Sequence, residues 1–89
     1  MPKYIDIHKS GKGLTAEDVA GAHQKDLEVQ QRYGVKYLKY WFDAQDGTVF
    51  CLSEAPNKAA AEAVHRESHG LVADEIFEVI EGPDPNVES

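Results

Sequence analysis

The order of strand-like and helix-like stretches constrains this chain more than any other feature. Alternating β-branched and aromatic residues predict strands, whereas apolar residues at helical spacing predict helices. A strong hairpin signal, Asp46-Gly47, joins the second and third strand-like stretches. The expected elements are a strand at 3–9, a helix from the N-cap Thr15 to Tyr33-Gly34, strands at 35–43 and 48–53, a second helix, and a strand at 75–81. Ala55-Pro56-Asn57 should start the second helix, with Pro56 in its first turn, and the helix should continue over 58–69.

This β-α-β-β-α-β order predicts an α+β protein of the ferredoxin-like kind. Two βαβ-like halves with a central hairpin give a four-stranded antiparallel sheet in the order 4-1-3-2, with both helices on one face. A chain of 89 residues has room for one such domain. We therefore expect a single domain over residues 1–82 and a flexible C-terminal tail over 83–89, where two prolines and polar residues follow the last strand pattern.

The predicted strands are apolar on both faces, although helices cover only one. A solvated sheet face normally alternates with polar residues. The uncovered face therefore needs a partner, and we expect a homodimer packed sheet to sheet; a monomer with a partly apolar face is the alternative. The paired faces are Phe50 and Leu52 against Val49 and Cys51, Ile76 and Ile80 against Phe77 and Val79, and Leu38, Tyr40 and Phe42 against Val35, Tyr37 and Trp41.

Charge and cysteine content exclude several partners and compartments. The chain has 16 acidic and 9 basic residues, a formal charge of −7, which disfavours nucleic acid and anionic membranes. A single cysteine, Cys51, permits no internal disulfide. The N-terminus lacks the apolar run of a signal peptide, and no window suits a membrane span. We expect a cytoplasmic protein with neither nucleic-acid nor membrane partners.

Four histidines are the candidates for chemistry. His65 and His69 are four residues apart on one predicted helix, so two imidazoles can chelate one nickel, zinc or copper ion. A solvated helix end is the alternative for this pair. The topology brings the end of this helix to the sheet edge where His8 emerges, and His23 lies on the apolar stripe of the first helix. His65, His69, His23 and His8 are therefore candidate metal ligands.

The sequence leaves the direction of His8 open. His8 shares a strand face with Tyr4 and Asp6, opposite Ile5 and Ile7. If the isoleucines face the helices, His8 points into the cleft between two subunits instead. His23 also has an alternative role, because a histidine on an apolar helical stripe is often a hydrogen-bonded core residue.

Asp26 and Cys51 are weaker metal-ligand candidates. Asp26 follows His23 by three residues and can orient it or join a metal shell, with an exposed helix carboxylate as the alternative. Cys51 lies mid-strand, where a free cysteine usually acts as a small hydrophobe. The sequence places no base beside it and contains neither a phosphate loop nor a nucleophile elbow, so we predict no catalytic residue.

Five segments of the chain carry a recognisable pattern. They are Tyr4-Ile5-Asp6-Ile7-His8, Ala22-His23-Gln24-Lys25-Asp26-Leu27, Tyr33-Gly34-Val35, Val49-Phe50-Cys51-Leu52 with Ala55-Pro56, and Val64-His65-Arg66-Glu67-Ser68-His69-Gly70. At these residues the chain resembles the small bacterial nickel-binding, nickel-responsive proteins, a family long catalogued without a function, and the resemblance extends from Lys3 to Val79. It implies a ferredoxin-like fold, a dimer of the dimeric α+β barrel type and nickel binding, with the histidines as candidate ligands.

Three functions are compatible with these features. The first is a cytoplasmic binder of nickel, zinc or another divalent metal, for sequestration or metal response. The second is a small-molecule-binding protein or cofactor-independent enzyme of the monooxygenase or isomerase type, with His8 and Trp41 in the cleft of an α+β barrel dimer. The third is an interaction module without a ligand.

Overall fold

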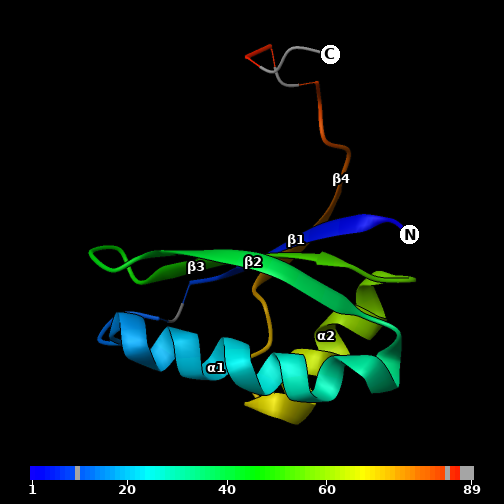
Figure 1. The fold of residues 1–89 in the computed structure, drawn as a ribbon. Coiled ribbons are helices and arrows are strands. Elements are labelled where there is room, and N and C mark those ends of the chain that lie inside the picture. The colour runs from blue at the N-terminus through cyan, green and yellow to red at the C-terminus, as the bar shows by residue number, and fades with distance from the viewer. Residues whose placement is uncertain (10, 84, 87–89) are drawn as a thin grey trace.

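The expected element order and strand topology are confirmed. A computed structural model of the chain describes residues 1–9, 11–83, 85 and 86 (Figure 1). The elements are β1 (Lys3–His8), α1 (Ala16–Val29), the 3-10 helix η1 (Gln30–Tyr33), β2 (Lys36–Asp43), β3 (Thr48–Glu54), α2 (Lys58–Ser68) and β4 (Glu75–Val79). The sheet is antiparallel, in the order β2-β3-β1-β4, and both helices cover one face, as a ferredoxin-like α+β fold requires (Figure 1).

Local signals start and stop the helices near the predicted residues. Thr15 and Asp18 form a reciprocal capping box at the start of α1, with Asp18 N donating to Thr15 Oγ1 at 3.1 Å. Gly34 ends η1 with a left-handed φ of 66°. The prediction for Pro56 is wrong in detail, because Asn57 is the N-cap of α2 and Pro56 precedes the helix instead of lying in its first turn.

The last strand is shorter than expected. β4 ends at Val79, so Ile80 lies beyond the strand and is 95% exposed. The predicted pairing of Ile76 with Ile80 on one face is therefore wrong. Much of the predicted tail over 83–89 lies outside the described residues, and the division at residue 82 stays a prediction.

A register shift in β2 changes which side chains face the helices. The shift lies between Tyr37 and Lys39, and Tyr40 and Phe42 then pair with Cys51 and Val49 of β3. Tyr37 is buried in the hydrophobic core, and Tyr40 and Phe42 pack against that core. Trp41, by contrast, is 48% exposed. The expectation that Tyr37 shares a face with Trp41 is therefore wrong, because the irregularity interrupts the alternation.

The alternation of β1 resolves the direction of His8. Tyr4, Asp6 and His8 are buried, and Asp6 reaches His65 on α2. His8 therefore faces the helix layer, while Ile5 and Ile7 face the other way. His8 and Trp41 lie on opposite faces of the sheet, so no cleft lined by both forms within this subunit.

Both helices lie on one side of the sheet, and among the described residues no helix covers the other face (Figure 1). Trp41 and Phe77, for example, are 48% and 49% exposed. We call this surface the open face, and its apolar residues are Ile5, Ile7, Trp41, Phe50, Leu52, Phe77 and Val79. Across the described residues, the helices are too short or too polar to cross a membrane.

Candidate metal centre

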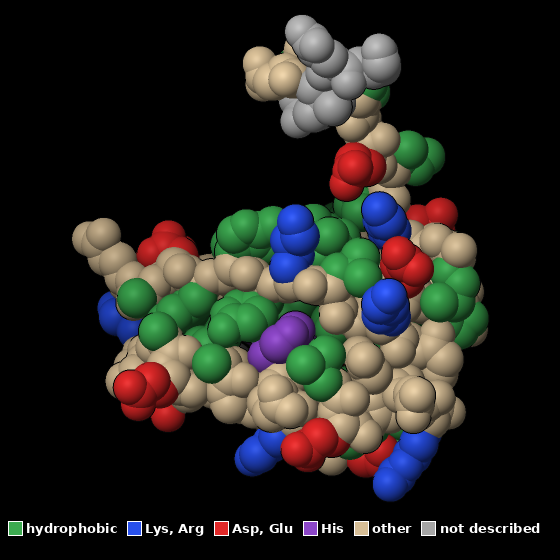
Figure 2. Space-filling model, viewed as in Figure 1, with side chains coloured by type: hydrophobic (Ala, Val, Ile, Leu, Met, Phe, Trp, Pro, Cys, Tyr) green, Lys and Arg blue, Asp and Glu red, His purple; other side chains and the backbone are tan. Residues whose placement is uncertain are grey.

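A cavity of about 50 Å³ lies between the sheet and the helix layer. All four histidines line it, together with Asp26 and Cys51, and much of the remaining wall is apolar. Figure 2 shows a histidine side chain among hydrophobic side chains in the hollow between the two layers. Since one water needs about 10–15 Å³ of such space, the cavity has room for a few waters, or for an ion that exchanges most of its hydration shell for protein ligands.

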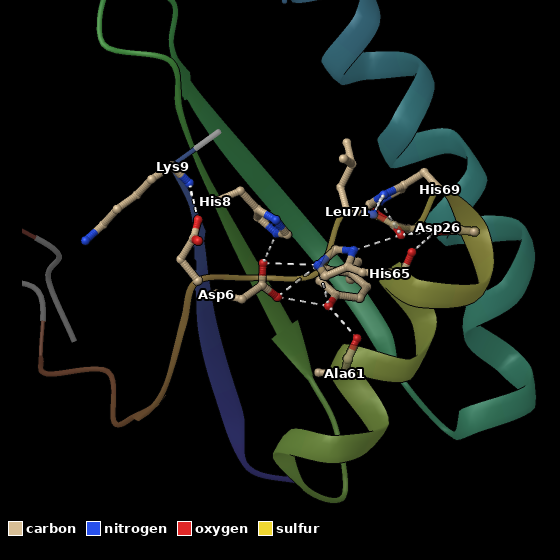
Figure 3. Close-up of polar contacts among 11 residues, drawn as sticks. Asp6, His8, Lys9, Asp26, Ala61, His65, His69 and Leu71 are labelled. Carbon is tan, nitrogen blue, oxygen red and sulfur yellow. Dashed lines mark hydrogen bonds and ion pairs between the residues drawn. The ribbon is translucent and has the colours of Figure 1, made fainter. Parts of the chain in front are cut away.

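His65 is the centre of the polar network beside this cavity. Its side chain projects from α2 toward β1 and is 1% exposed (Figure 3). His65 Nδ1 lies 2.9 Å from Asp26 Oδ1, and His65 Nε2 lies 3.1 Å from each carboxylate oxygen of Asp6. One imidazole ring thus joins α1 and β1 through two buried carboxylates.

The strand side of the network comes from β1 and β2. His8 Nε2 lies 2.8 Å from Asp6 Oδ1, because residues two apart on a strand share a face. Tyr37 Oη lies 2.9 Å from Asp6 Oδ2, 3.0 Å from the Ala61 carbonyl oxygen and 2.8 Å from His65 Nε2. Asp6 is 0% exposed, so these contacts replace its hydration shell.

On the helix side of the network, three side chains contact the same oxygen atom, Asp26 Oδ1. Asp26 Oδ1 accepts from Ser68 Oγ at 2.6 Å and lies 3.1 Å from His69 Nε2, in addition to its contact with His65. On the far side of its ring, His69 Nδ1 accepts from the backbone N–H of Leu71 at 3.1 Å (Figure 3). Asp26 is 2% exposed, so the alternative of an exposed carboxylate is wrong.

The network fixes the protonation of its members. Burial alone would raise the pKa of Asp6, but hydrogen bonds from His65 and His8 lower it to about 2. Burial would also raise the pKa of Asp26, and hydrogen bonds from His65 and His69 hold it far below its usual range. Burial would lower the pKa of His65, but hydrogen bonds to Asp26 and Asp6 raise it to about 12. At neutral pH the metal-free protein therefore holds an imidazolium between two carboxylates.

Two overlapping groups of side chains could hold a metal ion, and His65 belongs to both. The strand-side set is Asp6, His8, Cys51 and His65, and the helix-side set is Asp26, His65 and His69. Within each set the potential ligand atoms lie within 4.8 Å of one another. The structure therefore brings together His8, His65 and His69, three of the four predicted histidines, and both weaker candidates.

His23 is the predicted ligand that neither set includes. Its ring packs against Tyr40 with centroids 4.7 Å apart, and its buried Nδ1 has no hydrogen-bond partner among the described residues. Burial lowers the pKa of His23, which keeps the ring neutral and its lone pair available beside the cavity. His23 thus lines the cavity but lies outside both sets of potential ligands.

Sequence reasoning missed Asp6 and Tyr37. The available signal was the period-2 pattern of β1, which places Asp6 between Tyr4 and His8 on one face. Tyr37 had no such signal, because the register shift in β2 determines where its side chain points.

The donor chemistry of these residues fits a divalent transition metal. Imidazole suits nickel, zinc and copper, while carboxylate and thiolate groups complete mixed sites. Burial raises the pKa of Cys51 to about 11, so its thiol keeps its proton at neutral pH unless a cation replaces that proton. The charges also match, since a divalent cation in place of the His65 proton would neutralise the carboxylates of Asp6 and Asp26.

A family model places these residues in a known group. The model described as nickel responsive protein SCO4226-like matches residues 4–79. The chain belongs to this family. The SCO4226-like match spans every residue of both potential ligand sets, and it confirms the resemblance seen in the sequence.

A solved structure of an SCO4226 protein supports the same fold. The crystal structure of SCO4226 from Streptomyces coelicolor A3(2) superimposes with a TM-score of 0.84 at 38% sequence identity. The alignment covers 91% of this chain and 99% of that one. No curated protein matches the chain.

Proposed function

We propose that this protein is a cytoplasmic binder of nickel, or of a similar divalent metal such as zinc, which it sequesters or to which it responds. Membership of a nickel responsive family supports the choice of nickel. The cavity wall supplies imidazole, carboxylate and thiol groups, which are the ligands such ions use. No catalytic step is part of the proposal.

The observation that carries the proposal is the position of His65 between two buried carboxylates. Asp6 and Asp26 bring two negative charges into a site that contains one strongly held proton. Buried charges are costly unless they are paired. A divalent cation with His65 deprotonated balances both carboxylates, which favours a doubly charged ion over a monovalent one.

Calorimetric titration of metal-stripped protein with nickel tests the proposal. We expect one or more tight sites in the wild type, lost in His65→Gln and weakened in His8→Gln or His69→Gln. His23→Gln is the matched control, because it replaces a cavity histidine that belongs to neither set. Circular dichroism confirms that each variant is folded. Equal, weak binding by the wild type and His65→Gln would refute a site at this cavity.

We also propose that two copies pair through the open face. Half-exposed Trp41 and Phe77 lie on a sheet surface that no helix covers. Contiguous exposed apolar surface of this kind is typical of an interface, and a two-fold dimer is the commonest arrangement. The cavity lies on the opposite side of the sheet, so each subunit would keep its own metal site.

A further inference from the structure

Both ring nitrogens of His69 have partners in this structure. Its Nδ1 accepts the Leu71 N–H at 3.1 Å, which requires a lone pair on Nδ1. A neutral imidazole has one such lone pair and one N–H, so the proton lies on Nε2, which faces Asp26 Oδ1 at 3.1 Å. The contact with Leu71 therefore selects one tautomer of His69.

That tautomer cannot bind a metal ion through either nitrogen. Ligation through Nδ1 would take the lone pair that Leu71 N–H uses. Ligation through Nε2 would move the proton to Nδ1, where two donors, Nδ1–H and Leu71 N–H, would face each other. Metal binding by His69 and the Leu71 hydrogen bond are thus mutually exclusive, whichever nitrogen coordinates.

The segment that holds Leu71 is anchored at both ends, and between them Val72 N donates to the carbonyl oxygen of Gly70 at 3.2 Å, a contact within the segment itself. Gly70 N donates to the His65 carbonyl oxygen at 2.8 Å, and Gly70 has a left-handed φ of 77°. At the other end, Asp74 N donates to the Ile7 carbonyl oxygen at 2.8 Å, and Asp74 Oδ2 accepts from Lys9 N at 2.6 Å. Movement on loss of the Leu71 bond would therefore concentrate in residues 71–73.

Leu71 also closes part of the cavity. Its side chain is one of the lining residues, yet it is 48% exposed, so it lies at the boundary between cavity and solvent. Val72 beside it is 39% exposed. Half-exposed apolar side chains hold a loop weakly, because little apolar area is buried there.

We propose that residues 70–74 form a metal-operated flap, which the Leu71–His69 hydrogen bond holds closed and which metal ligation by His69 releases. The inference rests on the proposed metal binding at this cavity. His69 then has two mutually exclusive roles. Without metal, its Nδ1 accepts the hydrogen bond from Leu71 N–H and its proton lies on Nε2; with metal bound, His69 is a ligand. The loaded protein then differs from the empty one in the surface around Leu71 and Val72.

Nuclear magnetic resonance of the ¹⁵N-labelled full chain tests the flap, with zinc as a diamagnetic probe. In the metal-free wild type, the His69 ring should carry its proton on Nε2. At saturating zinc, we expect the Leu71 amide to exchange about tenfold faster, which corresponds to losing about 1.4 kcal/mol of local protection. A ligand that only stabilised the folded protein would slow amide exchange, so faster exchange of the Leu71 amide would be specific to release of the flap.

His69→Asn is the matched control, because its amide oxygen can still accept from Leu71 N–H but nothing replaces Nε2. Zinc should leave the Leu71 amide protected in this variant. The flap is overturned if calorimetry shows zinc bound to the wild type while Leu71 exchange and the His69 tautomer stay unchanged. Absence of both zinc and nickel binding to the wild type overturns the flap and the proposed function together.

Discussion

His65 on α2 and Asp26 on α1 are held 2.9 Å apart in the interior, and this contact ties the two helices together above the sheet. The carboxylate of Asp26 is 2% exposed, so it depends on its partners for stabilisation. His65 extends the link to Asp6 on β1 through its other ring nitrogen. The candidate metal site is therefore also a structural connection between the layers.

Replacing Asp26 with Asn should destabilise the metal-free protein by about 1–3 kcal/mol, because it removes the charge from hydrogen bonds with His65, Ser68 and His69 and leaves Asp6 as the carboxylate partner of His65. Denaturant unfolding, followed by circular dichroism, measures the change. Glu28→Gln on the same helix is the control, because Glu28 is exposed, and it should change stability by less than about 0.5 kcal/mol. Equal stabilities of Asp26→Asn and wild type would contradict the pairing.

The hydroxyl of Tyr37 should contribute to the free energy of unfolding, whereas the hydroxyl of Tyr40 should not. Tyr37→Phe removes a group that contacts Asp6, His65 and the Ala61 carbonyl oxygen, and we expect a loss of about 1–2 kcal/mol in unfolding free energy. Tyr40→Phe keeps the ring that packs on His23 and should be nearly neutral. A larger loss for Tyr40→Phe than for Tyr37→Phe would show that the network is misplaced.

The stability of the metal-free protein should fall as pH rises above neutral. The folded-state pKa of His65, about 12, lies above its unfolded value of 6.5. Its contribution is therefore complete below pH 6.5 and is lost progressively as pH rises toward 12. Unfolding free energies at pH 7 and pH 10, measured with a chelator present, should differ more in the wild type than in His65→Gln. A parallel pH dependence in both proteins would contradict the buried imidazolium.

A charge on the open face should prevent pairing of subunits. Phe77→Lys introduces an ammonium where the proposed dimer buries an apolar ring, and we expect a monomer in light scattering where the wild type is a dimer. Leu27→Lys is the control, because Leu27 is 37% exposed on α1, away from the open face. A dimeric Phe77→Lys protein, or a monomeric wild type, would argue against this interface.

Much of the fold follows from sequence patterns, because the capping residues, the hairpin signal and strand alternation act locally. Thr15, Gly34 and Asp46-Gly47 mark boundaries that the structure confirms. The topology then brings His8 and His65 together, since the end of α2 meets the edge of β1. These inferences required only element order and handedness.

The details of the site depend on features that no local pattern encodes. The register shift in β2 turns Tyr37 toward Asp6, and a one-residue irregularity of this kind reverses the face of a side chain. Which face of β1 is buried depends on the side of the sheet that the helices cover. The sequence alone therefore did not decide whether His8 and Asp6 point toward the helices or away from them. His23 lines the cavity with the other histidines, but its ring packs against Tyr40 and it belongs to neither cluster of potential ligand atoms.

The most direct test of the account is a crystal structure of the nickel-loaded protein, with an anomalous difference map calculated from data collected at the nickel absorption edge. The account predicts an anomalous peak beside His65, within coordination distance of the strand-side or the helix-side set. Nickel peaks confined to surface residues, with His65 still hydrogen-bonded to Asp6 and Asp26, would contradict a metal site in the cavity.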